Sequence, residues 1–368
     1  MIPVAIPDLS GLEKEYVQEA LDSTWISSSG AFLDRFESEF ASLCQVKHSL
    51  AVCNGTVALH LALLALDVRP GDEVLVPSLT YIATANAVRY MGAVPVFVDV
   101  DPDTWCLDPS RLEDAITART KGIIAVHLYG HPADMDQINH IAGVHGLWVV
   151  EDAAEAHMAE YKGRRVGSMS SIATFSFFGN KVFTCGEGGA ITLNDDNLVL
   201  RARTLRGQGV DPDRRYYFPI VGYNFRLTNV AAAMLCAQIE RYQDILKRRQ
   251  EIFDLYEETL SGCRGVGFQP VADWAKRTPW LFSITIDPLE FGCSRDELAE
   301  MLLENGVDTR PFFYPLHKLP PYREGHAGKE PLVVTERLAE TGLNLPTYTT
   351  MSDDHVETVC RHILNIAK

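Results

Sequence analysis

The chain has 368 residues, of which 46% are hydrophobic, and it carries a formal net charge of −16. Its apolar content excludes global disorder, and its length suits two domains of roughly 100–200 residues each. An acidic balance argues against a general nucleic-acid or anionic-membrane surface, because such surfaces need clustered Lys and Arg side chains. We therefore expect neither nucleic acid nor a membrane as a partner.

The eight cysteines are scattered through the chain, with no CxxC pair and no His at a spacing typical of metal ligands. The N-terminal segment MIPVAIPDLSGLEKEY lacks the basic and apolar regions of a signal peptide, and no stretch approaches the ~18 apolar residues of a membrane span. These features predict a cytoplasmic protein with reduced thiols and no metal site.

Short apolar runs alternate with helical patterns in the first half of the chain. Strands are expected at residues 49–52, 73–76, 94–98, 122–126, 147–150, 171–177 and 190–193, and helices at 55–66, 81–90 and 135–145. Uniformly apolar strands separated by helices are typical of a parallel sheet that is covered on both faces. The sequence therefore predicts an α/β fold with a mainly parallel sheet between helices.

The second half of the chain has a different pattern. It predicts, in order, a long helix at 228–258, a strand at 280–286, a helix at 294–305, a Pro-rich loop at 311–321 and a final helix. We expect a large α/β domain at 1–240 and a smaller α+β domain at 241–368, with the N-terminal segment able to pack on the smaller one.

Polar residues follow several predicted strands, where open α/β sheets bind their ligands. Gly55 and Thr56 begin a helix, and its free N–H groups could bind a phosphate, although on this feature alone an ordinary helix cap is much the commoner explanation. Asp152 follows the run LWVV and could bind a cation or act as a base, or simply cap a helix. His127 ends the run IIAV and could be a ligand or a hydrogen-bonded core histidine.

The segment TFSFFGNKVFTCGEGG contains Lys181 just beyond a predicted strand. A lysine in an apolar pocket has a lowered pKa and becomes a usable amine nucleophile, whereas most lysines are solvated surface residues. Here Lys181 accompanies Asp152, Thr56 and Ser176. Pyridoxal phosphate needs this combination: a lysine for its aldehyde, a carboxylate for its ring nitrogen, and hydroxyl and N–H groups for its phosphate.

Six sequence blocks carry a resemblance to a known family. They are NGTVALHLAL, GDEVLVPSLTYIAT, VHLYGHPADM, VVEDAAEAH, TFSFFGNK with GEGG, and GYNFRLTN. In this order they resemble the nucleotide-sugar aminotransferases of the DegT/DnrJ/EryC1/StrS group. The resemblance implies a fold-type I enzyme dependent on pyridoxal 5'-phosphate, with pyridoxamine 5'-phosphate as intermediate. It also implies a homodimer or a larger assembly whose active sites are composite.

The resemblance also assigns residues to the cofactor. Lys181 would form the Schiff base and Asp152 would pair with the ring nitrogen, so these two are the expected catalytic residues. The other expected cofactor contacts are the phosphate ligands Gly55, Thr56 and Ser176, the ring-stacking Tyr81, Glu155 at the ring hydroxyl, and Asn224 from the neighbouring subunit.

Within the group, the segments STWISS, LRGQGVDPDRRYYFPIVGYNFR and FFYPLHKLPPY resemble members that use L-glutamate to aminate C4 of GDP-4-keto-6-deoxy-D-mannose. This subgroup makes GDP-perosamine and 2-oxoglutarate for polysaccharide biosynthesis. The implied substrate contacts are Trp25, Ser27, Ser28, Arg310, Tyr314 and His317.

The chain departs from the subgroup at Met158, which we expect to crowd the cofactor, and at Val182, Phe183 and Cys185, which remove hydroxyls expected near the site. Alternative acceptors are UDP- or dTDP-linked 3- or 4-keto sugars and cyclitol ketones. A related dehydratase class carries His at the lysine position, so Lys181 speaks against it. A non-catalytic regulatory relative is a further alternative, and intact Lys181 and Asp152 disfavour it.

Overall fold

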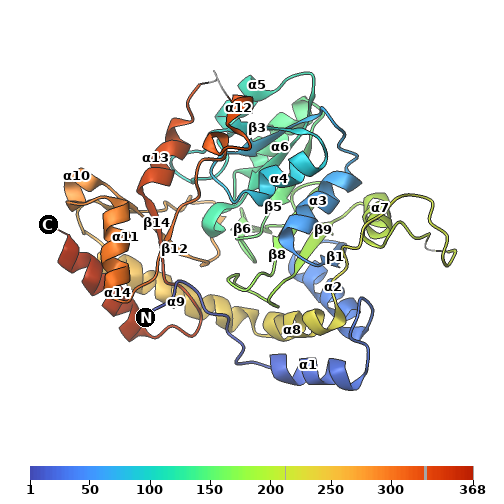
Figure 1. Ribbon diagram of the computed structural model, residues 1–368, viewed down its shortest axis with the longest axis horizontal. Coiled ribbons are helices and arrows are strands. Elements are labelled where there is room, and N and C mark those ends of the chain that lie inside the picture. The colour runs from blue at the N-terminus through green and yellow to red at the C-terminus, as the bar shows by residue number, and fades with distance from the viewer. Residues whose placement is uncertain (212, 327–329, 368) are drawn as a thin grey trace.

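The computed structural model describes residues 1–211, 213–326 and 330–367, and none of the helices in these ranges is long and apolar enough to cross a bilayer. Figure 1 shows two sheets with helices packed around them. All eight cysteines are free thiols.

The larger sheet has seven strands in the order β1-β9-β8-β5-β4-β2-β3. Their bounds are β1 (His48–Val52), β2 (Glu73–Pro77), β3 (Val94–Val98), β4 (Thr120–Val126), β5 (Trp148–Asp152), β8 (Ile172–Ser176) and β9 (Gly189–Leu193). Only β9 runs antiparallel to its neighbours within this sheet. The predicted α/β class with a mainly parallel sheet is confirmed.

Both faces of this sheet are buried, which explains why its strands lack polar alternation. Ile123 of β4 belongs to one hydrophobic cluster and the next residue, Ile124, belongs to another. The first cluster includes residues of α2 (Ala31–Leu43), α5 (Leu112–Ala115), α6 (Met135–Val144) and α8 (Asn229–Glu240). The second includes residues of α3 (Gly55–Ala65), α4 (Ala83–Tyr90) and α7 (Asp196–Arg206).

The long helix predicted at 228–258 is in fact two helices, α8 and α9 (Tyr242–Leu260). Arg241 separates them with φ −110° and ψ 19°. Its guanidinium bonds to the hydroxyl of Ser10 and pairs with Asp8. The helix is thus interrupted where Arg241 contacts the distant N-terminal segment, and the local sequence pattern could not predict that contact.

The second sheet is antiparallel, with strand order β10-β12-β14-β13. Its strands are β10 (Val266–Phe268), β12 (Phe282–Ile286), β13 (Arg310–Pro311) and β14 (Gly342–Leu345). Residues of α9, α11 (Arg295–Glu304) and α14 (Asp353–Ile366) share a hydrophobic cluster with it, and so does Ile2, which bridges Val307. The division into domains at residue 240 stays a prediction.

The remaining elements are short or peripheral. They are α1 (Glu13–Asp22), α10 (Pro288–Phe291), α12 (Arg323–His326), α13 (Val333–Thr341), a small sheet of β11 (Ala275–Lys276), β6 (Glu160–Tyr161) and β7 (Arg164–Arg165), and 3-10 turns at Pro109–Arg111, Leu128–Gly130 and Leu316–Lys318.

Candidate active site

A cavity of about 450 Å³ lies between the carboxyl end of the larger sheet and the edge of the second sheet. From the larger sheet it is lined by Val126, Asp152 and Ser176, which stand at the ends of β4, β5 and β8. Arg310 of β13 and Asn344 of β14 line it from the second sheet. This is where open α/β sheets place their ligand sites.

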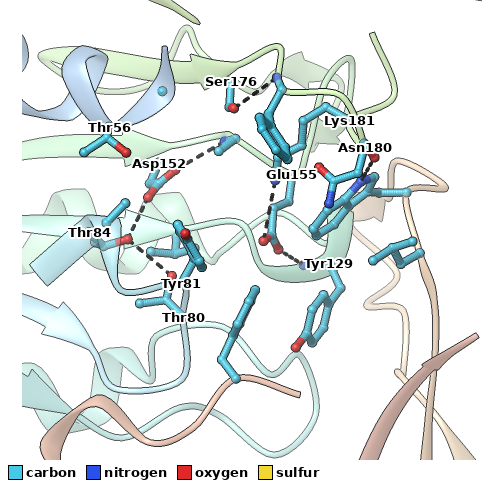
Figure 2. A pocket seen from close by; sticks show the side chains of 18 of the residues that line it. Thr56, Thr80, Tyr81, Thr84, Tyr129, Asp152, Glu155, Ser176, Asn180 and Lys181 are labelled. Atoms are coloured by element: carbon cyan, nitrogen blue, oxygen red, sulfur yellow. Dashed lines mark hydrogen bonds and ion pairs between the residues drawn. The ribbon is translucent and has the colours of Figure 1, made fainter. Parts of the chain in front are cut away.

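Lys181 projects into this cavity from the turn that follows β8 (Figure 2). Its Nζ lies 3.9 Å from Oε1 of Glu155 and 3.9 Å from the centre of the Trp280 ring. The indole Nε1–H of Trp280 donates a 2.8 Å hydrogen bond to the carbonyl of Asn180, which fixes the ring beside the lysine. Burial lowers the pKa of the Lys181 amine, and the carboxylates of Glu155 and Asp152 partly oppose that effect. A lysine in this setting is available as a nucleophile or base.

Asp152 ends β5, and its carboxyl is buried at the floor of the cavity. The Thr84 hydroxyl donates a 2.8 Å hydrogen bond to Oδ2, and the N–H of Ala154 donates one of 3.3 Å to Oδ1. Burial raises the pKa of this carboxyl, and the Thr84 hydrogen bond opposes the rise. The fixed carboxylate is suited to pair with a cationic N–H of a ligand.

Glu155 lies three residues beyond Asp152, on the opposite side of the cavity floor in Figure 2. Its Oε2 accepts a 2.9 Å hydrogen bond from the backbone N–H of Tyr129, while Oε1 faces Lys181. Burial raises the pKa of the Glu155 carboxyl to about 7, although the nearby lysine opposes the rise.

The first turn of α3 forms an anion seat at the other end of the cavity. Gly55 and Thr56 begin this helix, and the Asn54 side chain caps it by accepting the N–H of Val57. Ser176 lies against them: a Cβ at Gly55 would stand 2.7 Å from the Ser176 Cβ. Free N–H groups at a helix N-terminus beside two hydroxyls favour an anionic group such as a phosphate.

The model of the DegT/DnrJ/EryC1/StrS aminotransferase family matches residues 7–364. The chain belongs to this family. A GDP-perosamine synthase of Caulobacter vibrioides is 48% identical to it over 97% of this chain and 96% of the relative. The GDP-perosamine synthase of Escherichia coli O157:H7 is 46% identical over 98% and 97%. The crystal structure of S. venezuelae DesV aligns with a TM-score of 0.89 at 38% identity, covering 96% of this chain and 93% of that one.

The protein is therefore an enzyme, an aminotransferase, as its sequence predicts. Of the predicted site residues of this aminotransferase, eight line the cavity together. They are Gly55, Thr56, Tyr81, Asp152, Glu155, Ser176, Lys181 and Arg310. They come from segments far apart in the chain, so the fold assembles them.

The predicted entrance residues do not line the cavity of this chain. Trp25 is largely exposed, and its carbonyl accepts a 2.7 Å hydrogen bond from the Asn229 side chain. The carbonyl of Ser27 accepts the backbone N–H of Asn229, so the segment that includes Ser28 is fixed against the start of α8. Asn224 also lies outside the cavity, in an isolated bridge with Gly207.

Of the residues predicted near the C-terminal loop, Arg310 lines the cavity, whereas Tyr314 and His317 do not. Tyr314 is exposed and does not line the cavity. His317 is buried elsewhere: its Nδ1 lies 2.8 Å from the Ser78 hydroxyl and its Nε2 lies 3.1 Å from Oε1 of Glu336. The backbone N–H of His317 also donates to the Ser78 hydroxyl, so this histidine fastens the loop to the end of β2. These bonds hold His317 outside the cavity of its own chain, and its contact with the sugar stays a prediction.

The sequence departures from the subgroup are core residues. Met158, Val182, Phe183 and Cys185 are all buried in the first hydrophobic cluster, and none lines the cavity. Met158 therefore does not narrow the cavity, and the hydroxyls that Val182, Phe183 and Cys185 remove near the site are absent from the core and not from the cavity wall. The cavity wall keeps its own hydroxyls at Thr56, Thr80, Thr84 and Ser176.

Other residues of the cavity wall were not identified from the sequence. They include Thr84, Tyr129, Trp280, Phe313 and Asn344. Tyr129 lies three residues after the end of β4 at Val126, and this position just beyond a buried strand could have marked it as a residue of the site. Trp280 and Asn344 reach the cavity through packing between the two sheets, which no local pattern reveals.

Proposed function

We propose that this enzyme transfers an amino group from L-glutamate to the C4 ketone of GDP-4-keto-6-deoxy-D-mannose, giving GDP-perosamine and 2-oxoglutarate. One combined observation carries the proposal. Lys181, Asp152 and an anion seat meet in one cavity, in a chain 48% identical to a GDP-perosamine synthase over nearly its full length.

The cavity wall fits pyridoxal 5'-phosphate. Its donor set contains one amine, a buried carboxylate and a helix N-terminus flanked by hydroxyls. Gly55 leaves the seat open, because a side chain there would collide with Ser176. Lys181 would hold the aldehyde, Asp152 the ring nitrogen, and Gly55, Thr56 and Ser176 the phosphate. When bound, this cofactor supplies an electron sink for the carbon that loses a proton.

The residues of the chain then do the remaining work. Asp152, held by Thr84, keeps the ring nitrogen protonated by placing a negative charge against it. When its amine is not bound to the cofactor, Lys181 would be the base for the proton that leaves the substrate carbon and would hold that proton on Nζ. The Trp280 ring covers this amine and limits the access of water.

Substrate anions would meet Arg310 at the second-sheet side of the cavity. A guanidinium suits both the carboxylates of L-glutamate and a diphosphate, because it donates in a planar fork. Tyr81 lines the same cavity with more than half of its side chain exposed, and its ring would stack on the cofactor.

We further propose that two copies complete each active site. Asn224 lies outside the cavity of its own chain. It follows a loop at residues 213–223 that projects from the molecule (Figure 1). The side chains of Tyr216, Phe218 and Val221 on this loop are exposed. Exposed apolar side chains on one loop favour a protein partner, and the partner is a second copy that receives Asn224 in its cavity.

Subunit complementation tests this arrangement. Lys181→Ala and Asn224→Ala homodimers should each be nearly inactive. A mixed dimer would contain one site with both native residues, so activity should return on mixing after partial dissociation. A mixture that stays inactive although mixed dimers form would contradict the composite site.

We also place the reaction in the cytoplasm. All eight cysteines are free thiols, and five of them are buried. Unpaired thiols are the rule in a reducing compartment, where nucleotide sugars could be supplied in solution.

A half-reaction tests the substrate. The enzyme is loaded with pyridoxal phosphate, treated with L-glutamate, freed of the donor and then given GDP-4-keto-6-deoxymannose. We expect the absorbance of the bound cofactor to return to its starting form and a GDP-amino sugar to appear by mass spectrometry. A dTDP-linked 4-keto-6-deoxy sugar serves as the control. A response to the dTDP sugar alone would contradict the GDP assignment and leave the amino transfer standing.

A further inference from the structure

Lys181 and Glu155 form an acid–base pair in the cavity, and the contacts proposed for the cofactor do not explain why these two groups lie so close. Nζ of Lys181 and Oε1 of Glu155 are 3.9 Å apart, which is too long for a hydrogen bond and close enough for strong charge coupling. Both side chains are mostly buried, with exposed fractions of 12% and 6%. Each group therefore depends on the protonation state of the other.

The backbone fixes the Glu155 carboxyl in this position. Its Oε2 accepts the N–H of Tyr129, and Tyr129 has φ 52° and ψ 29° inside a 3-10 turn. The left-handed region is rare for a bulky residue, so the surrounding structure must enforce it. With Oε2 held in this way, Oε1 remains directed at Lys181.

Two further charged groups, Asp152 and Arg310, act on this pair. Asp152 lies on the same cavity floor as a second buried carboxyl. Arg310 faces Lys181 from β13, and the ring of His157 lies close enough to interact with it electrostatically. Burial holds the pKa of His157 at about 3, so this ring is neutral and supplies no positive charge. Two carboxyls thus face one lysine and the more exposed Arg310.

We propose that Glu155 and Lys181 share one proton, and that Glu155 thereby controls whether the lysine is a neutral amine. Because Nζ and Oε1 are 3.9 Å apart, the exchange goes through water: Nζ gives its proton to water and becomes a free amine, and Oε1 takes a proton from water, so the carboxylate becomes a carboxylic acid. When Glu155 is ionised, its charge retains the proton on Lys181. Glu155 is a positioning residue for the proton, and it acts through the lysine.

The chemistry of the cavity supports this pairing. Burial raises the pKa of Glu155 to about 7 and lowers the pKa of Lys181, so the difference between the two pKa values becomes smaller. A protonated Glu155 can also donate a hydrogen bond, whereas an ionised one can only accept. The carboxyl can therefore face an anionic oxygen of a ligand without repulsion.

The inference rests on the proposed function for its role in catalysis, but its test does not use turnover. The full-length protein is freed of cofactor by dialysis against cysteine and acetylated with acetic anhydride at pH values from 6 to 10. Peptide mass spectrometry then measures the extent of labelling at Lys181, with the exposed Lys121 as internal reference. Only the neutral amine reacts, so the pH midpoint of labelling reports the protonation of Lys181.

Glu155→Gln removes the negative charge and keeps an oxygen for the Tyr129 N–H. We expect its Lys181 midpoint to fall by about one to three pH units, because an opposite charge at this distance stabilises the ammonium by that amount. Below the wild-type midpoint, labelling should then be at least about 10-fold faster. Glu187→Gln is the matched control, since Glu187 lines the same cavity and should leave the midpoint unchanged.

An unchanged midpoint in Glu155→Gln would overturn the proposal. If that variant does not fold, Glu155→Asp withdraws the charge from the amine and should shift the midpoint in the same direction by a smaller amount. No shift in a folded Glu155→Asp would overturn the proposal equally. A shifted midpoint together with a failed sugar half-reaction would contradict the substrate assignment alone, and the reverse result would contradict the shared proton alone.

Discussion

The hydroxyl of Thr84 donates a 2.8 Å hydrogen bond to Oδ2 of Asp152, which connects the first turn of α4 to the end of β5. Thr84 also lies 3.3 Å from the hydroxyl of Thr80, and all three side chains line the cavity. Because the Asp152 carboxyl is buried, a donor to its charged form decides how readily it stays ionised.

Thr84→Val should therefore weaken the enzyme at low pH. A hydrogen bond to a charged group is worth roughly 1.5–3 kcal/mol, so its loss raises the pKa of Asp152 further. Activity needs the ionised carboxylate and disappears as the pH falls through this pKa, so the acid limb of the profile should move to higher pH. Measuring kcat against pH tests this expectation.

Thr80→Val is the matched control for that experiment. It removes a hydroxyl from the same wall without removing a bond to Asp152. Equal acid limbs in Thr84→Val and the wild type would show that the hydroxyl does not govern the carboxyl.

Lys181→Ala should lose turnover almost completely. The variant lacks the amine that we propose to bind the cofactor and to move the proton, and positioned acid–base catalysis alone contributes roughly 10²–10⁴-fold. Steady-state formation of 2-oxoglutarate from L-glutamate with the keto sugar measures the loss. Lys162→Ala should remain fully active, because that lysine is exposed and pairs with Asp136. Appreciable turnover by Lys181→Ala would refute the assignment of this lysine.

Much of this site could be predicted because its residues follow buried strands. Asp152 ends β5 and Ser176 ends β8, so uniformly apolar runs marked the positions where polar side chains would meet. The resemblance in sequence blocks then assigned chemistry to those positions. Lys181 belongs to the same group, since it lies in the turn directly after β8.

The parts that could not be predicted depend on contacts between distant segments. Trp280 reaches Lys181 only because the second sheet packs over the end of the first. His317 is predicted to contact the sugar, but its bonds to Ser78 and Glu336 hold it outside the cavity of its own chain. Side-chain direction in an irregular loop follows such packing, and sequence spacing does not encode it.

Gly130→Ala should destabilise the fold. Gly130 has φ +91°, and a Cβ there would collide with the carbonyl oxygen of Thr278. That carbonyl belongs to the segment leading to Trp280, and the N–H of Thr278 donates to the Gly130 carbonyl over 2.9 Å. We expect the unfolding free energy to fall by about 1–3 kcal/mol through overpacking, in addition to the backbone strain. Urea denaturation measures the change.

Gly146→Ala separates these two contributions. Gly146 has φ +65° and nothing within 4 Å of an added Cβ, so it reports the backbone strain alone. If the two variants lost the same stability, the collision with Thr278 would contribute nothing.

His157→Leu should make the protein less sensitive to acid. The His157 ring is buried among Phe175, Phe177 and Phe183, and both of its nitrogens lack a hydrogen-bond partner among the described residues. Burial lowers its pKa from 6.5 to about 3. Below pH 6.5 His157 is therefore protonated in the unfolded chain but stays neutral in the folded chain.

Above pH 6.5 the ring is neutral in both the folded and the unfolded chain, so His157 does not lower the free energy of unfolding. As the pH falls from 6.5 towards 3, that free energy decreases by about 1.4 kcal/mol per pH unit. At pH 5 the wild type should thus have lost about 2 kcal/mol that His157→Leu retains. The difference between unfolding free energies at pH 7 and pH 5, measured in urea for both proteins, isolates this residue because the other histidines are common to both. Equal losses in the two proteins would mean that His157 is protonated in the folded state as readily as in the unfolded chain.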